Sequence, residues 1–283
     1  MAPKTVLITG CSEGGIGYAL AVAFAKRQLN VFATARDLTK MQSLSKYSNI
    51  TLLALDVTDP TQIATVVEQV STKTGGTLDY LVNNSGVLYI MPALDSDIEE
   101  GKKMFEVNFW GVLRMTQAFS PLLVAAKGTV VNIGSLLGYL YNPYLSIYNA
   151  SKTALHAFDE PLRLELKPLN VKVLTVVTGA IETSIHVNAP GVKLPEKSFY
   201  RAVQNRLNAL KTDEVKVKRT EAHVYAEKVV NDVLGGASGK TFRGSYSSIA
   251  KYATMYLPTF VTDSLLTQAS DLDKVTVSVK NGK

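Results

Sequence analysis

Short apolar runs, many of them β-branched, recur along the first 180 residues, and most end in a glycine or a polar residue. Runs of this kind are typical of strands buried on both faces of a parallel sheet. Segments with helical character separate them at crossover spacing. We predict strands at 6–8, 30–35, 51–55, 78–82, 129–133 and 171–177, and helices at 18–26, 60–73, about 99–126 and around 148–152.

This alternation predicts an α/β protein: a single-domain Rossmann-type fold with a doubly wound parallel sheet and helices on both faces. The chain has no internal repeat of solenoid period and no low-complexity linker. We therefore expect one reductase-sized domain over residues 1–246. Residues 247–283 are expected to form a C-terminal extension that packs on the same domain.

The composition of the chain limits the classes of protein to which it can belong. Apolar residues make up 46% of the 283 residues, which is enough for a large core. A single cysteine, Cys11, excludes an intrachain disulfide. The first residues do not form a signal peptide, and no run reaches the roughly 18 apolar residues of a membrane span. We expect a cytoplasmic protein. The three histidines lack metal-ligand spacing, so no metal site is predicted.

A glycine cluster lies between the first strand and the first helix, at Gly10, Gly14, Gly15 and Gly17. Glycines there let the backbone approach a pyrophosphate, and the helix N-terminus supplies N–H groups and positive potential. An ordinary turn is the alternative. The flanking strand and helix favour a dinucleotide site.

The second strand ends in Arg36, which is followed by Asp37. An acidic residue at this position suits the ribose 2′-hydroxyl of NAD, whereas a cation suits the 2′-phosphate of NADP. Because the arginine comes first, the sequence favours NADPH/NADP+ as the cofactor. The alternative is a solvated loop arginine.

Tyr148 and Lys152 lie one turn apart on a predicted helix face. A free tyrosine has a pKa of about 10, and a nearby cation is expected to lower it, which makes the phenol a usable general acid or base. Ser135 follows the strand at 129–133, and its hydroxyl is predicted to bind the same substrate oxygen. A surface Tyr–Lys pair is the alternative interpretation.

Together these motifs resemble the short-chain dehydrogenase/reductase family over about residues 4–246. Within that family the likeness is to the fungal 1-acyldihydroxyacetone-phosphate reductase-like group, through the segments 148–152 and 162–171. The motifs, in order, are Thr9-Gly10, Gly15-Ile16-Gly17, Asp56, Asn83-Asn84-Ser85-Gly86, Asn108, Ser135, Tyr148 and Lys152.

The resemblance implies a role for each matching residue. Tyr148 would exchange the proton, Lys152 would hold the nicotinamide ribose, Ser135 would orient the carbonyl, and Asn108 would anchor a water that relays protons to Lys152. The implied cofactor-binding residues are Gly10, Ser12, Gly15, Ile16, Gly17, Arg36, Asp56, Val57, Asn83, Tyr148, Lys152, Gly179 and Thr183.

The chain also departs from the family pattern. The glycine loop is one residue longer, and Thr178-Gly179 replaces the usual Pro-Gly, with Thr183 retained. Pro161 falls inside the helix of Tyr148, where it is expected to bend the helix near Ala157 or to end it. Family members often pair through this helix, so a homo-oligomer is implied but the proline puts that face in doubt.

The family places a lid after the sixth strand, here about residues 178–220. Residues 193–219 carry +5 of the chain's net +6. Phe199, Val203, Leu207 and Leu210 recur at helical spacing there, and the later segment 249–266 is mostly apolar. Such a lid suits a hydrophobic ketone or alcohol as the substrate. In one form of this hypothesis the substrate also carries an anionic group. Peripheral contact with the endoplasmic reticulum or a lipid droplet is a second expectation. The alternative is a solvated lid and a packed helix.

Three functions from different classes fit these features. The leading one is an NADPH-dependent carbonyl reductase with Tyr148 as proton donor, acting on an acyl-dihydroxyacetone-phosphate-like lipid or a secondary-metabolite or steroid-like ketone. A non-catalytic NADP(H)-binding regulatory protein is the alternative, and the intact catalytic set argues against it. Nucleic acid is not expected as a partner, because the basic charge lies in one segment without base-stacking motifs.

Overall fold

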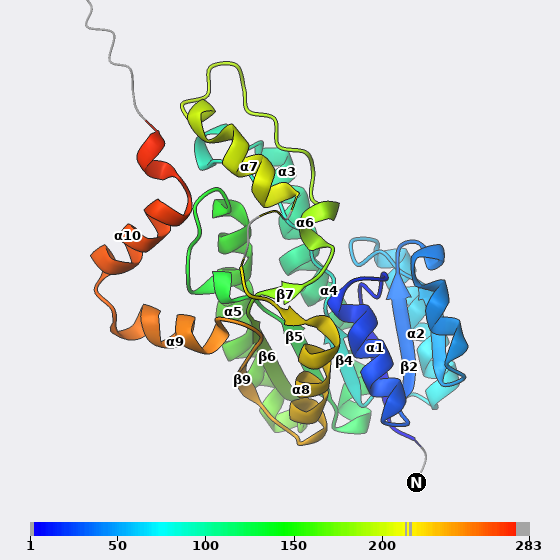
Figure 1. Cartoon of the computed structure of the whole chain (residues 1–283). Helices are drawn as coiled ribbons and strands as arrows, with labels where there is room; N and C mark the ends of the chain where they lie inside the picture. The colour runs from blue at the N-terminus through cyan, green and yellow to red at the C-terminus, as the bar shows by residue number, and fades with distance from the viewer. Residues whose placement is uncertain (1–2, 213, 215–216, 276–283) are drawn as a thin grey trace, which may run out of the picture.

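The computed structural model describes residues 3–212, 214 and 217–275. Seven strands form one parallel sheet in the order β3-β2-β1-β4-β5-β6-β9 (Figure 1). The strands are β1 Thr5–Ile8, β2 Asn30–Ala35, β3 Ile50–Ala54, β4 Tyr80–Asn83, β5 Thr129–Ile133, β6 Lys172–Thr178 and β9 Gly239–Arg243. Because β1 pairs with both β2 and β4, the chain winds outward in two directions, and the predicted doubly wound fold is confirmed. The edge strand β9 was not predicted, since its sequence contains no apolar run.

Helices cover both faces of the sheet (Figure 1). The helices α1 and α8 pack together on one face, and α2, α4 and α5 contribute to the apolar cluster on the other. The bounds are α1 Ile16–Lys26, α2 Pro60–Thr74, α3 Ile98–Phe105, α4 Gly111–Ala126, α5 Ser146–Leu166 and α8 Ala222–Leu234.

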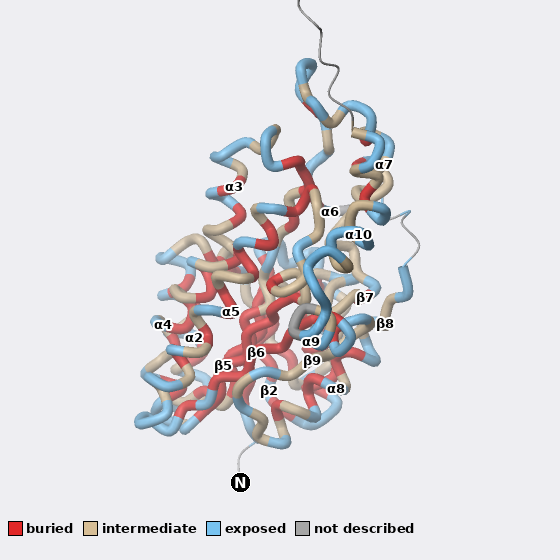
Figure 2. The backbone as a smooth tube through the Cα atoms, turned by 90° about the vertical axis from the view of Figure 1, so that its left-hand side faces the viewer, coloured by how far each residue is buried: buried red, intermediate tan, exposed pale blue. Residues whose placement is uncertain are grey.

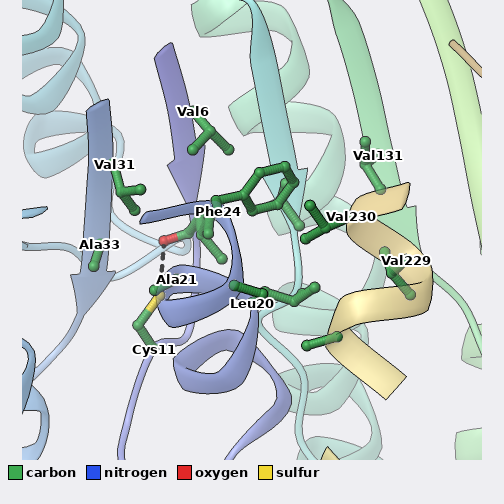
Figure 3. Packing of buried hydrophobic residues seen from close by; sticks show 14 of the residues in the cluster. Val6, Cys11, Leu20, Ala21, Phe24, Val31, Ala33, Val131, Val229 and Val230 are labelled. Carbon is green, nitrogen blue, oxygen red and sulfur yellow. Dashed lines mark hydrogen bonds between the residues drawn. The ribbon is translucent and has the colours of Figure 1, made fainter. Parts of the chain in front are cut away.

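The core follows the apolar pattern of the sequence. On α1, Leu20, Ala21 and Phe24 recur at helical spacing and are fully buried, and they pack with Val6 of β1 and Val230 of α8 (Figure 3). Figure 2 shows the buried residues concentrated along the sheet and exposed ones around it. The sheet is therefore a rigid platform whose strand ends position the side chains that follow them.

The helical stretch predicted at 99–126 is divided in the structure. A π-helical turn, Glu106–Trp110, separates α3 from α4. Such turns change the direction in which a side chain leaves a helix and are frequent at functional sites. Here the turn contains Asn108, one of the predicted site residues.

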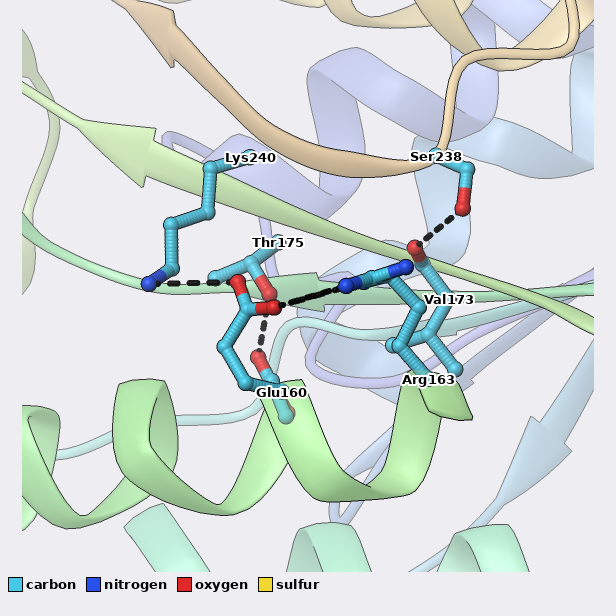
Figure 4. A network of polar contacts seen from close by, with 7 residues as sticks. Glu160, Arg163, Val173, Thr175, Ser238 and Lys240 are labelled. Atoms are coloured by element: carbon cyan, nitrogen blue, oxygen red, sulfur yellow. Dashed lines mark hydrogen bonds and ion pairs between the residues drawn. The ribbon is translucent and has the colours of Figure 1, made fainter. Parts of the chain in front are cut away.

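The helix α5 continues past Pro161 to Leu166, so the expectation that it ends there is wrong. A bend at this point stays a prediction. Contacts on both sides of the proline hold the segment: Glu160 pairs with Arg163 at 3.2 Å and with Lys240 of β9 at 3.2 Å (Figure 4). Leu162 is buried in the core. These contacts offset the backbone hydrogen bond that the proline removes.

The remaining elements surround the carboxyl ends of the strands. They are β7 Ile181–Glu182, α6 Ile185–Asn188, α7 Gln204–Lys211, β8 Thr220–Glu221, α9 Ser247–Tyr256 and α10 Thr259–Ala269. On α7 and the 3-10 turn before it, Val203 and Leu207 are buried as predicted. Phe199 is 62% exposed instead, because it precedes the first helical turn at Arg201.

The C-terminal helices leave many large apolar side chains exposed, and Ile249, Tyr252, Tyr256 and Phe260 are all more than half exposed. Close contacts with the rest of the fold come from Ala250 of α9, which is buried, and from the residues that follow α10. Across the described residues, no helix combines the length and the hydropathy needed to cross a bilayer.

Candidate active site

A cavity of about 1230 Å³ opens at the carboxyl ends of the strands, where the strand order reverses between β1 and β4. Ligands bind at this position in open α/β sheets. The loops after the two strands are joined: Asn84 Nδ2 donates to the Thr9 and Gly10 carbonyl oxygens at 2.8 and 3.0 Å. The predicted site residues that line the cavity are Gly10, Ser12, Gly15, Ile16, Arg36, Asp56, Val57, Ser135, Tyr148, Lys152, Gly179 and Thr183.

The glycine loop is shaped for close backbone approach. Gly10 has φ +71° and Gly14 has φ +76°, which glycine adopts without strain. Gly17 does not line the cavity. A Cβ there would lie 2.5 Å from Asn84 Nδ2 and against the Gly10 carbonyl oxygen. The α1 helix begins at Ile16 with no side-chain cap, so its first N–H groups are available to an anion such as a pyrophosphate.

Cys11 lies in this loop but points into the core. Its thiol is fully buried and donates to the Ile8 carbonyl oxygen at 3.3 Å (Figure 3). Burial raises the pKa of the Cys11 thiol to about 12. The residue is therefore a small packing group rather than a reactive thiol.

Two basic side chains, Arg36 and Lys40, follow the end of β2. Arg36 lines the cavity, and Lys40, which sequence reasoning missed, lines it as well. The Asp37 carboxylate turns to the following 3-10 turn, where it accepts from Thr39 N at 2.9 Å and Thr39 Oγ1 at 2.6 Å. These hydrogen bonds lower the pKa of Asp37. Asp37 does not line the cavity, so the charged side chains that line it here are Arg36 and Lys40, with Glu13 of the glycine loop beside them.

Tyr148 and Ser135 lie beside each other in the wall of the cavity. Ser135 follows β5 and Tyr148 lies in the first turn of α5. Tyr148 is 8% exposed and Ser135 is equally buried. A polar group of a substrate that reaches both hydroxyls would therefore be shielded from water, which strengthens the hydrogen bonds it accepts.

The pKa of Tyr148 moves in the direction opposite to the sequence prediction. Burial raises it above its ordinary value, and the hydrogen bond with Ser135 opposes that shift without cancelling it. The Lys152 ammonium lies 5.9 Å from the centre of the Tyr148 ring and makes its hydrogen bond elsewhere. Tyr148 is consequently protonated at neutral pH, as a proton donor must be.

Lys152 is 6% exposed, and its Nζ donates to the Ile133 carbonyl oxygen at 3.1 Å. Burial lowers the pKa of Lys152 to about 8, and the charge of Asp159 partly opposes the shift. Asn108 lies close to Lys152. A Cβ added at Gly86 would lie 3.8 Å from Lys152 Nζ and 3.5 Å from Asn108 Oδ1.

Asn108 itself does not line the cavity. Its amide accepts from Val87 N at 2.8 Å and donates to Val87 O at 3.0 Å and Ser151 Oγ at 3.1 Å. The π-helical turn aims the side chain at these partners. The observed contacts join the loop after β4 to α5, and the predicted water relay stays a prediction.

His156 positions the serine, a role that the sequence could not assign. Its Nε2 accepts from Ser135 N at 3.3 Å, and its ring lies against Gly134, Gly138 and Tyr139. Burial, with the nearby lysine charges, lowers the pKa of His156 to about 3, so the ring is neutral and can accept this hydrogen bond.

Asn83, like Gly17, is a predicted cofactor residue that does not line the cavity. Its side chain lies in the core, where Nδ2 donates to Asn132 Oδ1 at 2.9 Å, and Asn132 donates to Asp159 Oδ1 at 2.6 Å. These contacts fit the predicted role of Asn83 in supporting the sheet, and its role toward the cofactor stays a prediction. The neighbouring Asn84 lies at the cavity instead.

Apolar side chains form the other half of the cavity. They come from the loop after β4, α3, the loop before α5, α7 and the end of α10. Members of this wall are Leu88, Met104, Leu137, Tyr144, Leu210 and Leu266. A glycine cradle with adjacent cations, a buried Ser–Tyr–Lys set and an apolar chamber thus share one space. This arrangement defines an oxidoreductase that uses a nicotinamide dinucleotide.

Comparison with known proteins agrees with this class. The family model described as short chain dehydrogenase matches residues 4–190. The chain is 50% identical over 263 residues to the short-chain dehydrogenase ptmH of Penicillium ochrochloron, covering 93% of this chain and 96% of that protein. It is 45% identical over 203 residues to the NADPH-dependent 1-acyldihydroxyacetone phosphate reductase of Schizosaccharomyces pombe, covering 70% and 68%.

A solved short-chain dehydrogenase from Streptomyces avermitilis superposes with a TM-score of 0.76 at 27% identity, covering 97% of each chain. The chain therefore belongs to the short-chain dehydrogenase/reductase family, whose members interconvert alcohols and carbonyl compounds.

Proposed function

We propose that the protein is an NADPH-dependent carbonyl reductase that acts on a hydrophobic ketone, with Tyr148 as the proton donor. The observation that carries the proposal is the placement of a protonated, buried Tyr148 beside Ser135 in a cavity that also has an extensive apolar wall. The substrate carbonyl oxygen would accept hydrogen bonds from both hydroxyls, and Tyr148 would give its proton to the developing alkoxide.

The cofactor would lie on the glycine loop, with its 2′-phosphate beside Arg36 and Lys40. A bound nicotinamide would supply the hydride. Lys152 would hold positive charge beneath the ribose and balance the charge on the Tyr148 oxygen once its proton has left. NADPH oxidation against acyl-dihydroxyacetone phosphate, steroid and polyketide-like ketones tests the proposal, and absence of turnover with all three classes would contradict it.

The likeness to the acyldihydroxyacetone phosphate reductase supports a lipid ketone, and the likeness to ptmH supports a secondary-metabolite ketone. A non-catalytic NADP(H)-binding protein is the competing function. It would bind NADPH and oxidise it with no ketone of the panel.

Replacing Arg36 by alanine is expected to weaken NADPH binding by about tenfold or more and NADH binding little, because a charge-assisted hydrogen bond to the 2′-phosphate is lost. Fluorescence titration with both cofactors measures this. Lys26, a helix residue away from the cavity, provides the control as Lys26→Ala. An equal loss for NADPH and NADH would mean that Arg36 does not read the phosphate.

The pH dependence of reduction should report Lys152. Because the pKa of Lys152 is lowered to about 8, its positive charge is complete below that pH and is lost as the pH rises through it. We expect kcat/KM for a neutral ketone to be flat from about pH 6 to 7 and to fall roughly tenfold per pH unit well above 8. A flat profile up to pH 9.5 would exclude a requirement for the charged lysine.

A further inference from the structure

The basic residues of the lid are not equivalent. Four of the eight in residues 193–219 are exposed to solvent, namely Lys193, Lys197, Arg201 and Lys218. In the described part of this segment, Arg206 and Arg219 line the cavity. The positive charge of the segment is therefore divided between its outer surface and partly buried side chains, and the cavity receives charge at particular positions.

Arg206 leaves α7 next to the fully buried Leu207. Its Nη2 donates to the Ala269 carbonyl oxygen at the end of α10. Its Nε is buried and has no hydrogen-bond partner among the described residues. A buried donor of a charged group that lacks an acceptor is costly, so its presence in a cavity wall calls for an acceptor from a ligand.

Much of the wall beside Arg206 is apolar, and the C-terminal segment closes it. Tyr144 Oη donates to the Ser270 carbonyl oxygen at 2.8 Å, and Leu272 and Val275 pack on the apolar cluster that contains Tyr144. Low polarity around a guanidinium strengthens its attraction for an anion.

The acidic side chain near this wall does not balance the positive charge of Arg206. Asp271 and Arg206 act on the pKa of Tyr144 in opposite directions, so both lie near that ring. The Asp271 carboxylate, however, pairs with Lys274 Nζ at 2.9 Å. Among the described residues, no acidic side chain therefore forms an ion pair with Arg206.

We propose that Arg206 determines substrate specificity by binding an anionic group, a carboxylate or a phosphate, carried by the hydrophobic ketone. This inference rests on the proposed reductase function and names its substrate class. A guanidinium suits either anion because its donors form a planar fork. The exposed Arg201, which precedes α7 and lies outside the cavity, does not take part.

Calorimetric titration of the purified full chain tests the site without turnover. The probes are octyl phosphate, octanoate and octanol, below their micelle concentrations, with NADP+ present. We expect both anions to bind wild type at least about tenfold more tightly than octanol. Arg206→Gln should weaken the anions by about 10- to 100-fold and leave octanol unchanged, Arg206→Lys should restore part of the loss, and Arg201→Gln should match wild type.

Equal affinity for the anions and octanol in wild type would overturn the proposal, as would an equal loss in Arg201→Gln and Arg206→Gln. If Arg206→Gln does not fold, the wild-type comparison and Arg206→Lys decide.

A keto acid and its ethyl ester, assayed as substrates, separate this inference from the reductase function. Reduction of the ester with no advantage for the acid removes the anion site alone. Anion-selective binding without reduction of either ketone removes the reductase function alone.

Discussion

Replacing Tyr148 by phenylalanine is expected to lower the turnover of ketone reduction by at least about 100-fold, the lower range for loss of a general acid. The ring keeps its packing, so NADPH affinity and the melting temperature should change little. The reason is local: Tyr148 is buried and protonated, and its hydrogen-bond partner is Ser135.

Single-turnover oxidation of NADPH, with product detected separately, measures this effect. Tyr141 offers a matched control, since it lies in the loop before α5, is 57% exposed and is outside the cavity. Tyr141→Phe should retain wild-type rates. Turnover of Tyr148→Phe within a few-fold of wild type would remove the proposed proton donor and would redirect attention to Ser135 or to solvent.

Replacing Gly17 by valine is expected to abolish measurable NADPH binding, a loss of more than about 100-fold. Any Cβ at this position meets the Asn84 amide at 2.5 Å and the Gly10 carbonyl oxygen, so the glycine loop must move. Moving it breaks the hydrogen bonds from Asn84 that join the loops after β1 and β4. Several N–H contacts to phosphate would then be lost together, each worth about 1.5–3 kcal/mol.

NADPH fluorescence titration and a thermal melt, taken together, separate loss of binding from loss of folding. The control is Gly191→Ala, because a Cβ there meets no atom within 4 Å and the backbone is not in the left-handed region. If Gly17→Val binds NADPH within tenfold of wild type, the glycine loop does not form the phosphate cradle.

The fold could be predicted because its strands are short apolar runs bounded by glycines and polar residues, a pattern that local sequence contains in full. The same holds for Ser135, Tyr148 and Lys152, whose spacing brings a strand end to a helix face. Edge strand β9 escaped prediction because its burial is only partial and its sequence carries no apolar run.

Quantities that depend on distant neighbours could not be predicted. The sequence shows that the charge of Lys152 lies near Tyr148. It does not show the burial of Tyr148, whose effect is larger and raises the Tyr148 pKa. The hydrogen bond from Ser135 N to His156 Nε2 joins residues 21 positions apart. The difference between Arg201 and Arg206 is likewise invisible in the sequence, because both are arginines on a basic segment, and only the structure shows that Arg201 precedes α7 while Arg206 lines the cavity.

The apolar wall of the cavity is built from both sides of residue 190, where the match to the family model ends. Leu88 and Tyr144 come before that point, as do the glycine loop and the Ser–Tyr–Lys set, whereas Leu210 of α7 and Leu266 of α10 come after it. A substitution in α7 or α10 can therefore change which ketone fits while the residues that move the proton stay as they are. Substrate preference can be redesigned in this part of the chain separately from proton transfer.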